Sequence, residues 1–301
     1  MIAVLGSINM DLMVRVPRFP QPGETISGTD AKSYSGGKGA NQAVAAARLG
    51  SEVLLFGKVG DDVFGDRLLA ELRDNHVDVG AVERVSNCAS GMASIWVNEQ
   101  GGNAIVVAAG ANGYVDRDYL PRYLTVLHRA NTLLLQLEIP IETVGELLRQ
   151  LSSTTRPTVI LDPAPAQDLS HLPLARIDIL TPNEHELREI SGKESVEEGA
   201  FQLLDRGAHN VICTLGEDGA IWFSSDGTMA HFSSPKVDVV DTTAAGDAFN
   251  GALAWALQSH SLEDAIGHAV VAGALATTRL GAQASLPTQK HMQRFEASLG
   301  R

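Results

Sequence analysis

The chain is poor in aromatic residues and in positive charge, and each scarcity excludes a class of function. Aromatic side chains make up 5% of its 301 residues, too few for the stacking platforms on which proteins bind single-stranded nucleic acid. The formal net charge is −13, whereas phosphate backbones are held mainly by lysine and arginine. We therefore expect no nucleic-acid partner, and an anionic ligand would have to be met by local donors.

Cysteines and long apolar segments are also scarce. The two cysteines, Cys88 and Cys213, lie far apart in the sequence, which is typical of buried thiols in a reducing compartment rather than of a disulfide or a metal pair. Residues 1–6 enter an apolar stretch with no basic region before it and no run long enough for a signal peptide or a membrane span. We expect a cytoplasmic protein without a membrane partner.

Two common nucleotide-binding motifs are missing. The pattern Gly-x-x-x-x-Gly-Lys-Ser/Thr does not occur, because Lys58 is followed by Val59 and the Gly-Gly-Lys-Gly sequence at 36–39 by Ala40. A Gly-x-Gly-x-x-Gly fingerprint is also missing after the first predicted strand, which disfavours a dinucleotide-dependent dehydrogenase. The nine histidines show no metal-ligand spacing.

What the chain does have is a run of small residues between an apolar, β-branched stretch and a helical pattern, at 240–251. Ala244, Ala245 and Gly246 would let an anion approach the backbone, where the N–H groups of the first helical turn point at it. Asp247 in that turn could accept a proton from a hydroxyl while the amides hold the charge of a transferring phosphoryl group. Taken alone, the stretch is more typical of an ordinary helix start with a favourable acidic residue.

Strand and helix patterns alternate regularly from residue 111 onward, which predicts parallel βαβ units in a doubly wound α/β sheet. Strands are predicted at 132–137, 158–161, 177–180, 211–215 and 220–223. Helices are predicted at 119–130, 141–152, 184–191, 197–206, after Asp247, and at 262–280. Earlier in the chain, we predict strands at 2–5 and 53–60 and helices from about 38 to 49 and from 64 to 75.

Two β-rich stretches, 11–35 and 88–110, interrupt this pattern and are expected to pair as a small separate sheet. The remaining segments, 1–10, 36–87 and 111–301, would form the main α/β domain. Ligands of doubly wound sheets collect at the carboxyl ends of the strands, and polar side chains are frequent where the predicted strands end. These residues are Asn9, Asp11, Glu138, Asp162, Thr181, Asn183, Thr214 and Asp247.

Seven motifs in order along the chain together resemble the ribokinase-like (PfkB) carbohydrate kinase family. They lie at 6–11, 36–47, 136–138, 163–166, 181–184, 214–216 and 241–251. The second and the last are similar to the two signatures of that family, and the resemblance covers essentially the whole chain. It implies a doubly wound, mainly parallel sheet flanked by helices, with a small β lid over the sugar that often pairs between subunits.

The resemblance also assigns roles to residues of the site. Asp247 matches the catalytic base that takes the proton from the primary hydroxyl of the sugar, and Ala244, Ala245 and Gly246 match the anion hole for the γ-phosphate. The positions that match sugar contacts are Asn9, Asp11, Gly37, Lys38, Asn41, Glu138 and Asp247. Carboxylates and amides suit paired hydroxyls because each can form two hydrogen bonds.

The nucleotide and the ions have matching positions as well. Asn183 and Glu186 fall on the Asn-x-x-Glu element that is linked to Mg²⁺ and phosphate. The other ATP-binding positions are Thr214, Gly216, Gly219, Gly246 and His268, the last beside the adenine. The resemblance also implies an activating monovalent-cation site for K⁺, mostly of backbone carbonyls, at Asp241, Thr243, Ala276, Arg279, Gly281 and Ser285.

The resemblance implies ATP-dependent phosphorylation of the 5-hydroxyl of D-ribose, by a homodimer joined through the lid. A sibling kinase for 2-deoxyribose, another sugar or a nucleoside would share Asp247 and differ in its sugar contacts. An inactive sugar sensor on the same fold would be expected to lose Asp247 or Gly246, and both are present. Two departures from the family pattern are Asp162, where Asn is usual, and Thr243, where Ile is frequent.

Overall fold

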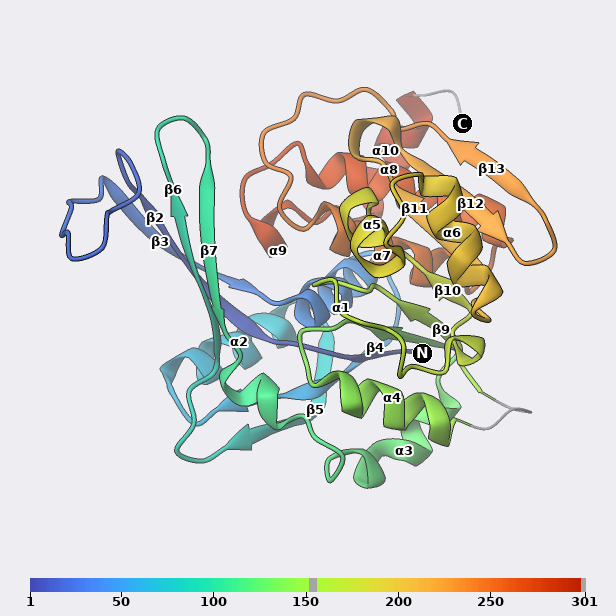
Figure 1. Ribbon diagram of the computed structural model, residues 1–301. Coiled ribbons are helices and arrows are strands. Elements are labelled where there is room, and N and C mark those ends of the chain that lie inside the picture. Colours follow the sequence, from blue (N-terminus) through green and yellow to red (C-terminus); the bar gives the residue numbers. More distant parts are fainter. Residues whose placement is uncertain (152–155, 299–301) are drawn as a thin grey trace.

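The computed structural model describes residues 1–151 and 156–298, which form a doubly wound α/β fold around a nine-stranded sheet (Figure 1). The strand order is β13-β12-β11-β10-β9-β8-β1-β4-β5, and all neighbouring strands are parallel except that β12 runs antiparallel to both β11 and β13. The strands are β1 (Ile2–Leu5), β4 (Val53–Gly60), β5 (Val77–Val85), β8 (Thr132–Leu135), β9 (Thr158–Leu161), β10 (Ile179–Leu180), β11 (Asn210–Thr214), β12 (Ala220–Ser224) and β13 (Met229–Phe232).

Helices cover both faces of this sheet, and the alternating side chains of β1 show the division. Ile2 and Val4 pack into one hydrophobic cluster, while Ala3 and Leu5 pack into the other. The first face is covered by α1 (Lys38–Arg48), α2 (Val63–Asp74), α7 (Ala245–Ala256), α8 (Leu262–Ala276) and α10 (Gln289–Ser298). The second face is covered by α3 (Leu120–Arg129), α4 (Ile141–Gln150), α5 (Glu184–Ser191) and α6 (Val196–Asp205).

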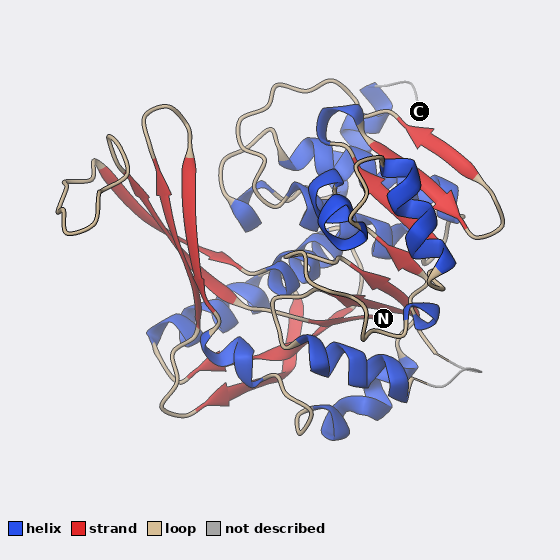
Figure 2. Cartoon of the chain, in the orientation of Figure 1, coloured by secondary structure: helices blue, strands red, loops and turns tan. Residues whose placement is uncertain are grey.

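A separate four-stranded sheet, which we call the lid sheet, stands away from the main body (Figure 2, left). Its strands, in the order β3-β2-β6-β7, are β2 (Asn9–Arg15), β3 (Asp30–Gly36), β6 (Gly91–Val97) and β7 (Asn103–Ala108). The two hairpins come from separate parts of the chain and join through a parallel pairing of β2 with β6. The predicted fold class, with its small additional sheet, is therefore confirmed. The domain boundaries themselves stay a prediction.

The element boundaries differ from the predicted ones in several places. The helix predicted at 262–280 ends at Ala276, because the Thr277 and Thr278 hydroxyls bond back to carbonyls of the last turn. The predicted strand at 132–137 ends at Leu135, and that at 177–180 begins only at Ile179. The helix predicted at 141–152 ends at Gln150, and its last predicted position lies outside the described residues.

Three further elements were not predicted: β5, β13 and α10. β5 alternates buried and exposed residues, as a strand at a sheet edge does, but its Asp and Gly residues conceal the pattern. A short helix, α9 (Ala282–Ser285), and 3₁₀ turns at Gly110–Tyr114, Leu174–Arg176 and Gly216–Asp218 complete the described structure. Within residues 1–151 and 156–298, no helix combines the length and apolar character that crossing a bilayer requires.

Candidate active site

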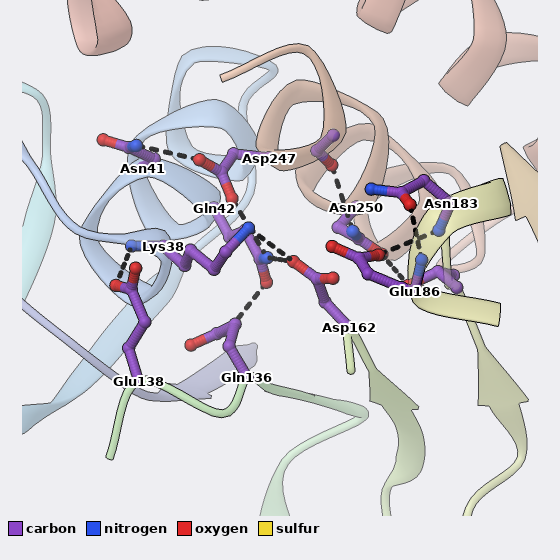
Figure 3. Close-up of polar contacts among 12 residues, drawn as sticks. Lys38, Asn41, Gln42, Gln136, Glu138, Asp162, Asn183, Glu186, Asp247 and Asn250 are labelled. Carbon is purple, nitrogen blue, oxygen red and sulfur yellow. Dashed lines mark hydrogen bonds and ion pairs between the residues drawn. The ribbon is translucent and has the colours of Figure 1, made fainter. Parts of the chain in front are cut away.

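A polar cleft of about 200 Å³ lies at the carboxyl ends of the main-sheet strands, where a doubly wound sheet binds its ligands. Figure 3 shows its side chains converging from α1, α5, α7 and the ends of β8 and β9. The lining residues are Lys38, Asp162, Thr181, Asn183, Glu186, Thr214, Thr242, Ala244, Ala245, Gly246, Asp247 and Asn250. The structure thus brings together side chains that are more than 200 residues apart in sequence.

The start of α7 lines the cleft with backbone N–H groups that could bind an anion. Ala244 precedes the helix with φ of 61°, in the left-handed region that residues other than glycine rarely adopt. α7 has no side-chain cap, and the N–H groups of Gly246 and Asp247 donate to no other described residue. These free donors and the positive end of the helix dipole suit the turn to bind an anion.

Asp247 lies in the same turn and is 6% exposed. Two amides from α1 hold its carboxylate: Asn41 Nδ2 donates to Oδ2 at 2.8 Å, and Gln42 Nε2 donates to Oδ1 at 3.3 Å. Burial raises the pKa of the Asp247 carboxyl, while the Lys38 charge and the Asn41 hydrogen bond act in the opposite direction. The result is a fixed carboxylate, suited to accept a proton from a hydroxyl at the anion site.

Close packing of α1 against α7 sets this geometry. Gly251 faces α1, and a Cβ atom at this position would lie 2.4 Å from the Ala45 Cβ and 2.8 Å from the Gln42 carbonyl oxygen. The two helices can approach this closely only because small residues meet at the contact. The approach brings Asn41 and Gln42 within hydrogen-bond distance of Asp247.

Lys38 and Asp162 form an ion pair in the cleft, with Lys38 Nζ 3.7 Å from Asp162 Oδ2. Burial by itself lowers the pKa of the Lys38 ammonium, but the surrounding carboxylates, Asp162 foremost, raise it above its usual value. Burial raises the pKa of the Asp162 carboxyl to about 7, although the charge of Lys38 opposes that shift. Lys38 is therefore a fixed cation beside the anion-binding turn.

The predicted sugar contacts gather at the end of β1 and the start of α1. Glu138 Oε2 accepts hydrogen bonds from the Ser7 hydroxyl at 2.5 Å, from the Lys38 backbone N–H at 3.1 Å and from Asn9 Nδ2 at 3.4 Å. Burial, and then the charges of Glu138 and Asp247, raise the pKa of Asp11 to about 7. The site thus holds several hydrogen-bonding groups, and Asp11 can change protonation near neutral pH.

Two glycines leave room for these groups. Gly37 has φ of 89°, and a Cβ there would lie 2.7 Å from the Asn9 backbone nitrogen. At Gly36, a Cβ would lie 2.1 Å from Asp11 Oδ2. Backbone therefore passes directly against the side chains of the predicted sugar site.

Asn112 belongs to this site but was missed from the sequence. It is 1% exposed, its Oδ1 accepts the Ile8 N–H at 2.9 Å, and its Nδ2 donates to Asn9 Oδ1 at 2.6 Å. The Asn9 side chain is thereby oriented so that its own Nδ2 faces Glu138. Asn112 lies in the 3₁₀ turn after the last lid strand, and no sequence pattern connects that turn to residue 9.

Asn183 and Glu186 both line the cleft and also form a capping box at the start of α5. Asn183 Oδ1 accepts the Glu186 N–H at 2.9 Å, and Glu186 Oε2 accepts the Asn183 N–H at 2.8 Å. The capping box uses Glu186 Oε2, and Glu186 lines the cleft together with Asp162 and Thr214. Oxygen donors of this kind fit Mg²⁺, which is usually held by one or two carboxylates together with phosphates and water.

Gly216, Gly219 and His268 do not line the cleft. The two glycines, with φ of 59° and 95°, form the turn between β11 and β12, next to Thr214. His268 lies on α8, where its Nδ1 is 2.7 Å from Glu296 Oε1 and its ring meets Trp255 edge-on. A role of these three residues in binding ATP stays a prediction.

Among the predicted monovalent-cation residues, Asp241 connects the loop that precedes α7 with the loop that precedes α9. Asp241 Oδ1 accepts the Thr243 N–H at 3.0 Å and its hydroxyl at 2.6 Å, while Asp241 Oδ2 accepts the Gly281 N–H at 2.9 Å. These hydrogen bonds lower the pKa of Asp241 in spite of its partial burial. Ala276 ends α8, Arg279 lies in the connecting loop, and Ser285 ends α9.

The doubly wound sheet, the lid sheet and an anion-binding helix start with a buried carboxylate together define a phosphotransferase for small hydroxyl compounds. The model of the pfkB family of carbohydrate kinases matches residues 1–289. The chain belongs to this family and is a carbohydrate kinase of the ribokinase-like fold.

The proteins similar to this chain include enzymes named for two different sugars, ribose and deoxyribose. A ribokinase of Haemophilus influenzae is 39% identical over 300 residues, covering 98% of this chain and 97% of that protein. A deoxyribokinase of Salmonella typhi is 36% identical over 301 residues, covering 98% of each. Among solved structures, an Arabidopsis thaliana ribokinase complexed with ribose and ATP has a TM-score of 0.85 and 32% identity, covering 97% of both chains.

Proposed function

We propose that this carbohydrate kinase transfers the γ-phosphoryl group of ATP to the 5-hydroxyl of D-ribose, giving ribose 5-phosphate and ADP. The observation that carries the proposal is the position of Asp247. Its buried carboxylate accepts hydrogen bonds from two side-chain amides of α1. The same turn of α7 that contains Asp247 presents free backbone N–H groups to an anion. A base and an anion-binding site therefore lie side by side, as an in-line transfer requires.

In the proposed mechanism, Asp11, Asn9, Glu138 and Asn41 hold the sugar with its terminal hydroxyl toward Asp247. Asp247 takes the proton as the hydroxyl oxygen attacks the γ-phosphorus, and the bond to the β-phosphate oxygen of ATP breaks. The N–H groups of Gly246 and Asp247, together with Lys38, stabilise the charge on the transferring group. Closure of the lid sheet would exclude water, which otherwise competes for ATP.

Magnesium fits the donor set of Asn183 and Glu186, which would hold it through oxygen atoms. When bound, it would neutralise charge on the ATP phosphates. The same cleft contains the hydroxyls of Thr181 and Thr214, which can bond to water or phosphate oxygens. We infer that ATP lies across this end of the cleft, with its γ-phosphate at the start of α7.

2-Deoxyribose is the alternative substrate, since the similar proteins include a deoxyribokinase as well as a ribokinase. Ribose is favoured because the predicted sugar contacts Asn9, Asp11 and Glu138 are all polar, and we infer that at least one of them pairs with the 2-hydroxyl, which 2-deoxyribose lacks. An unpaired buried polar group costs about 1–3 kcal/mol.

The experiment that tests the proposal measures ATP-dependent ADP release with ribose, 2-deoxyribose, fructose and adenosine. We expect kcat/KM for ribose to exceed that for 2-deoxyribose about tenfold or more, the ratio that one lost hydrogen bond of this kind produces. A higher value for 2-deoxyribose would overturn the sugar assignment but keep the kinase. Lack of turnover with all four compounds would contradict the choice of a ribose-like substrate.

The same assay tests the proposed potassium site. We expect K⁺ to raise turnover several-fold over Na⁺, because Asp241 joins the Thr243 and Gly281 loops next to the anion-binding turn. Asp241→Ala should abolish the difference between the two ions. Asp238→Ala, which removes an exposed acid three residues away, should leave the difference intact.

A further inference from the structure

Gln42 occupies the centre of a buried chain of amides and carboxylates (Figure 3). Its side chain is fully buried on α1. Gln42 Nε2 donates to Asp162 Oδ2 at 2.9 Å and to Asp247 Oδ1 at 3.3 Å, and Gln42 Oε1 accepts from Gln136 Nε2 at 2.6 Å. Neither Gln42 nor Gln136 is among the catalytic or binding residues predicted from the sequence.

The chemistry of the neighbours fixes which end of each amide faces which way. Asp162 Oδ2 and Asp247 Oδ1 each accept a hydrogen bond from Gln42 Nε2, so the Gln42 NH₂ group faces both carboxyl groups. The Gln42 carbonyl must then face a donor, and the Gln136 NH₂ group is that donor. Gln136 Oε1 lies in space that Gly6 leaves open, since a Cβ on Gly6 would come within 1.9 Å of this oxygen.

The hydrogen bonds among these side chains hold the carboxylate of Asp247. Asn41 donates to one oxygen of Asp247 and Gln42 donates to the other, so both carboxylate oxygens are held and the carboxylate plane has a fixed orientation. With Asn41 alone, the carboxylate could rotate about its remaining hydrogen bond, and the proton-accepting lone pair would lose its fixed direction. Misplacement of a base on this scale costs rate rather than substrate affinity.

We propose that Gln42 is a positioning residue for phosphoryl transfer, and that Gln136 is the residue that orients it. Gln42 holds Asp247 in the orientation in which its free lone pair faces the sugar hydroxyl, and it also ties Asp247 to the Lys38–Asp162 pair. The inference rests on the proposed function, because it presumes that Asp247 is the base.

The test uses Gln42→Met, which keeps side-chain length and apolar stem but removes both the NH₂ donor and the carbonyl acceptor of the amide. We expect kcat to fall about 10- to 100-fold, with KM for sugar and for ATP within about threefold of the parent values. Gln136→Met should lower kcat in the same way but less. The double variant should be no slower than Gln42→Met, because both changes interrupt one chain.

The pH dependence of kcat distinguishes a positioning role of Gln42 from a merely structural one, because loss of a purely structural contact would not shift it. Asp247 is faced by Lys38 on α1, Asp162 after β9, Glu138 after β8 and Asp11 on β2. All four remain in Gln42→Met, so loss of the amide donor should shift the acidic limb of the kcat profile to higher pH. An unshifted limb together with an unchanged kcat would overturn the proposal, as would equal and additive losses in the two single variants.

Two comparisons separate the possible failures. Gln202→Met makes the same chemical change on α6, outside the cleft, and should leave kcat and the pH profile unchanged. If the parent protein does not turn over ribose, the proposed function itself is wrong, and if Asp247→Asn keeps normal turnover, the assignment of Asp247 as the base is wrong. If Asp247→Asn abolishes turnover while folded Gln42→Met and Gln136→Met behave like the parent, only the role of Gln42 is wrong. Thermal unfolding shows whether each variant is folded, and Gln136→Met carries the test if Gln42→Met is not.

Discussion

The cleft contains more carboxylates than cations. Asp162, Asp247 and Glu186 all line it, and Lys38 is the one lysine or arginine among its lining residues. Both Asp162 and Asp247 are less than a tenth exposed, so the ionised form of each is disfavoured by burial. The carboxylates of the cleft therefore repel one another, and the charge of Lys38 offsets part of this repulsion.

At the residue scale, the first prediction concerns Asp247. Asp247→Asn keeps the size and the hydrogen-bonding capacity of the side chain but removes its basicity. We expect kcat to fall about 10²- to 10⁴-fold, the usual contribution of a general base, while ATP affinity changes little. Steady-state kinetics and ATP titration by calorimetry check both parts. Turnover near the parent value would show that another group accepts the proton.

The second prediction at this scale concerns Asp162, whose pKa is raised to about 7 in the fold from the ordinary value of 3.8. The folded state then holds this proton more tightly than the unfolded chain does, so stability falls as pH rises from about 4 to about 7. Asn cannot ionise, so Asp162→Asn should remove this part of the pH dependence of stability. We expect the difference in melting temperature between pH 5 and pH 8 to shrink by a few degrees, which corresponds to an order of 1 kcal/mol.

Asp11 follows the same trend, so some pH dependence should remain in Asp162→Asn. Asp74→Asn, at an exposed position on α2, makes the same change in charge and serves as the control. An unchanged difference in melting temperature in Asp162→Asn would show that Asp162 is ionised at both pH values.

At the scale of elements, the contact between α1 and α7 places Asp247 and the two amides that donate to it. α1 is rich in alanine, and Gly251 of α7 lies close to the Ala45 side chain and to the α1 backbone at Gln42 and Ala46. The start of each helix faces the cleft, with Lys38 on α1 and Gly246 on α7. A small change in the separation of these helices therefore changes the site as well as the core.

Gly251→Ala tests this contact. A methyl group at Gly251 would have to displace Ala45 and the backbone of α1, since these atoms lie within 3 Å of its position. We expect a loss of about 1–3 kcal/mol in the free energy of unfolding, with a lower kcat because Asn41 and Gln42 move away from Asp247. Denaturant unfolding and kinetics measure the two effects.

Gly267→Ala is the matched control. No atom lies within 4 Å of a Cβ at Gly267 on α8, so alanine should be accommodated and stabilise the helix by about 0.5–1 kcal/mol. Equal behaviour of the two variants would mean that the α1–α7 contact tolerates an extra methyl group.

At the scale of the whole molecule, the lid sheet presents an apolar edge. β7 is the last strand of this sheet, and Ile105, Val106 and Val107 are 53%, 69% and 53% exposed. An exposed apolar edge strand favours pairing with another chain. We propose that a second copy of this chain covers it, giving a homodimer joined through the lid sheets.

Val106→Glu should convert the dimer to a monomer, because a charge in the apolar contact would have to be buried without a partner. Light scattering coupled to size-exclusion chromatography measures the molar mass. Val63→Glu, at a position on α2 that is 77% exposed, introduces the same charge away from the lid and should leave the mass unchanged. A monomeric parent protein, or a dimeric Val106→Glu variant, would contradict the proposed interface.

Local patterns in the sequence were sufficient for much of the fold and for most of the cleft. The ranges predicted at 53–60, 158–161 and 184–191 coincide with β4, β9 and α5, because apolar periodicity and capping residues are local properties. The irregular edge strand β5 was missed, since its place in the sheet depends on pairing with β4 and not on its own composition. Helix ends such as that of α8 depend on individual hydroxyl contacts.

By itself, the sequence determined the alternation of strands and helices, the glycine-rich and alanine-rich turns, and the presence of Asp247 at a helix start. Only the tertiary structure decided which amides reach that carboxylate, how Asn112 orients Asn9, and how Gln136 orients Gln42. These contacts join residues about 100 to 200 positions apart. Their geometry depends on the separation of packed helices and on the donor or acceptor chosen by each neighbour, and neither is encoded in any short stretch of the chain.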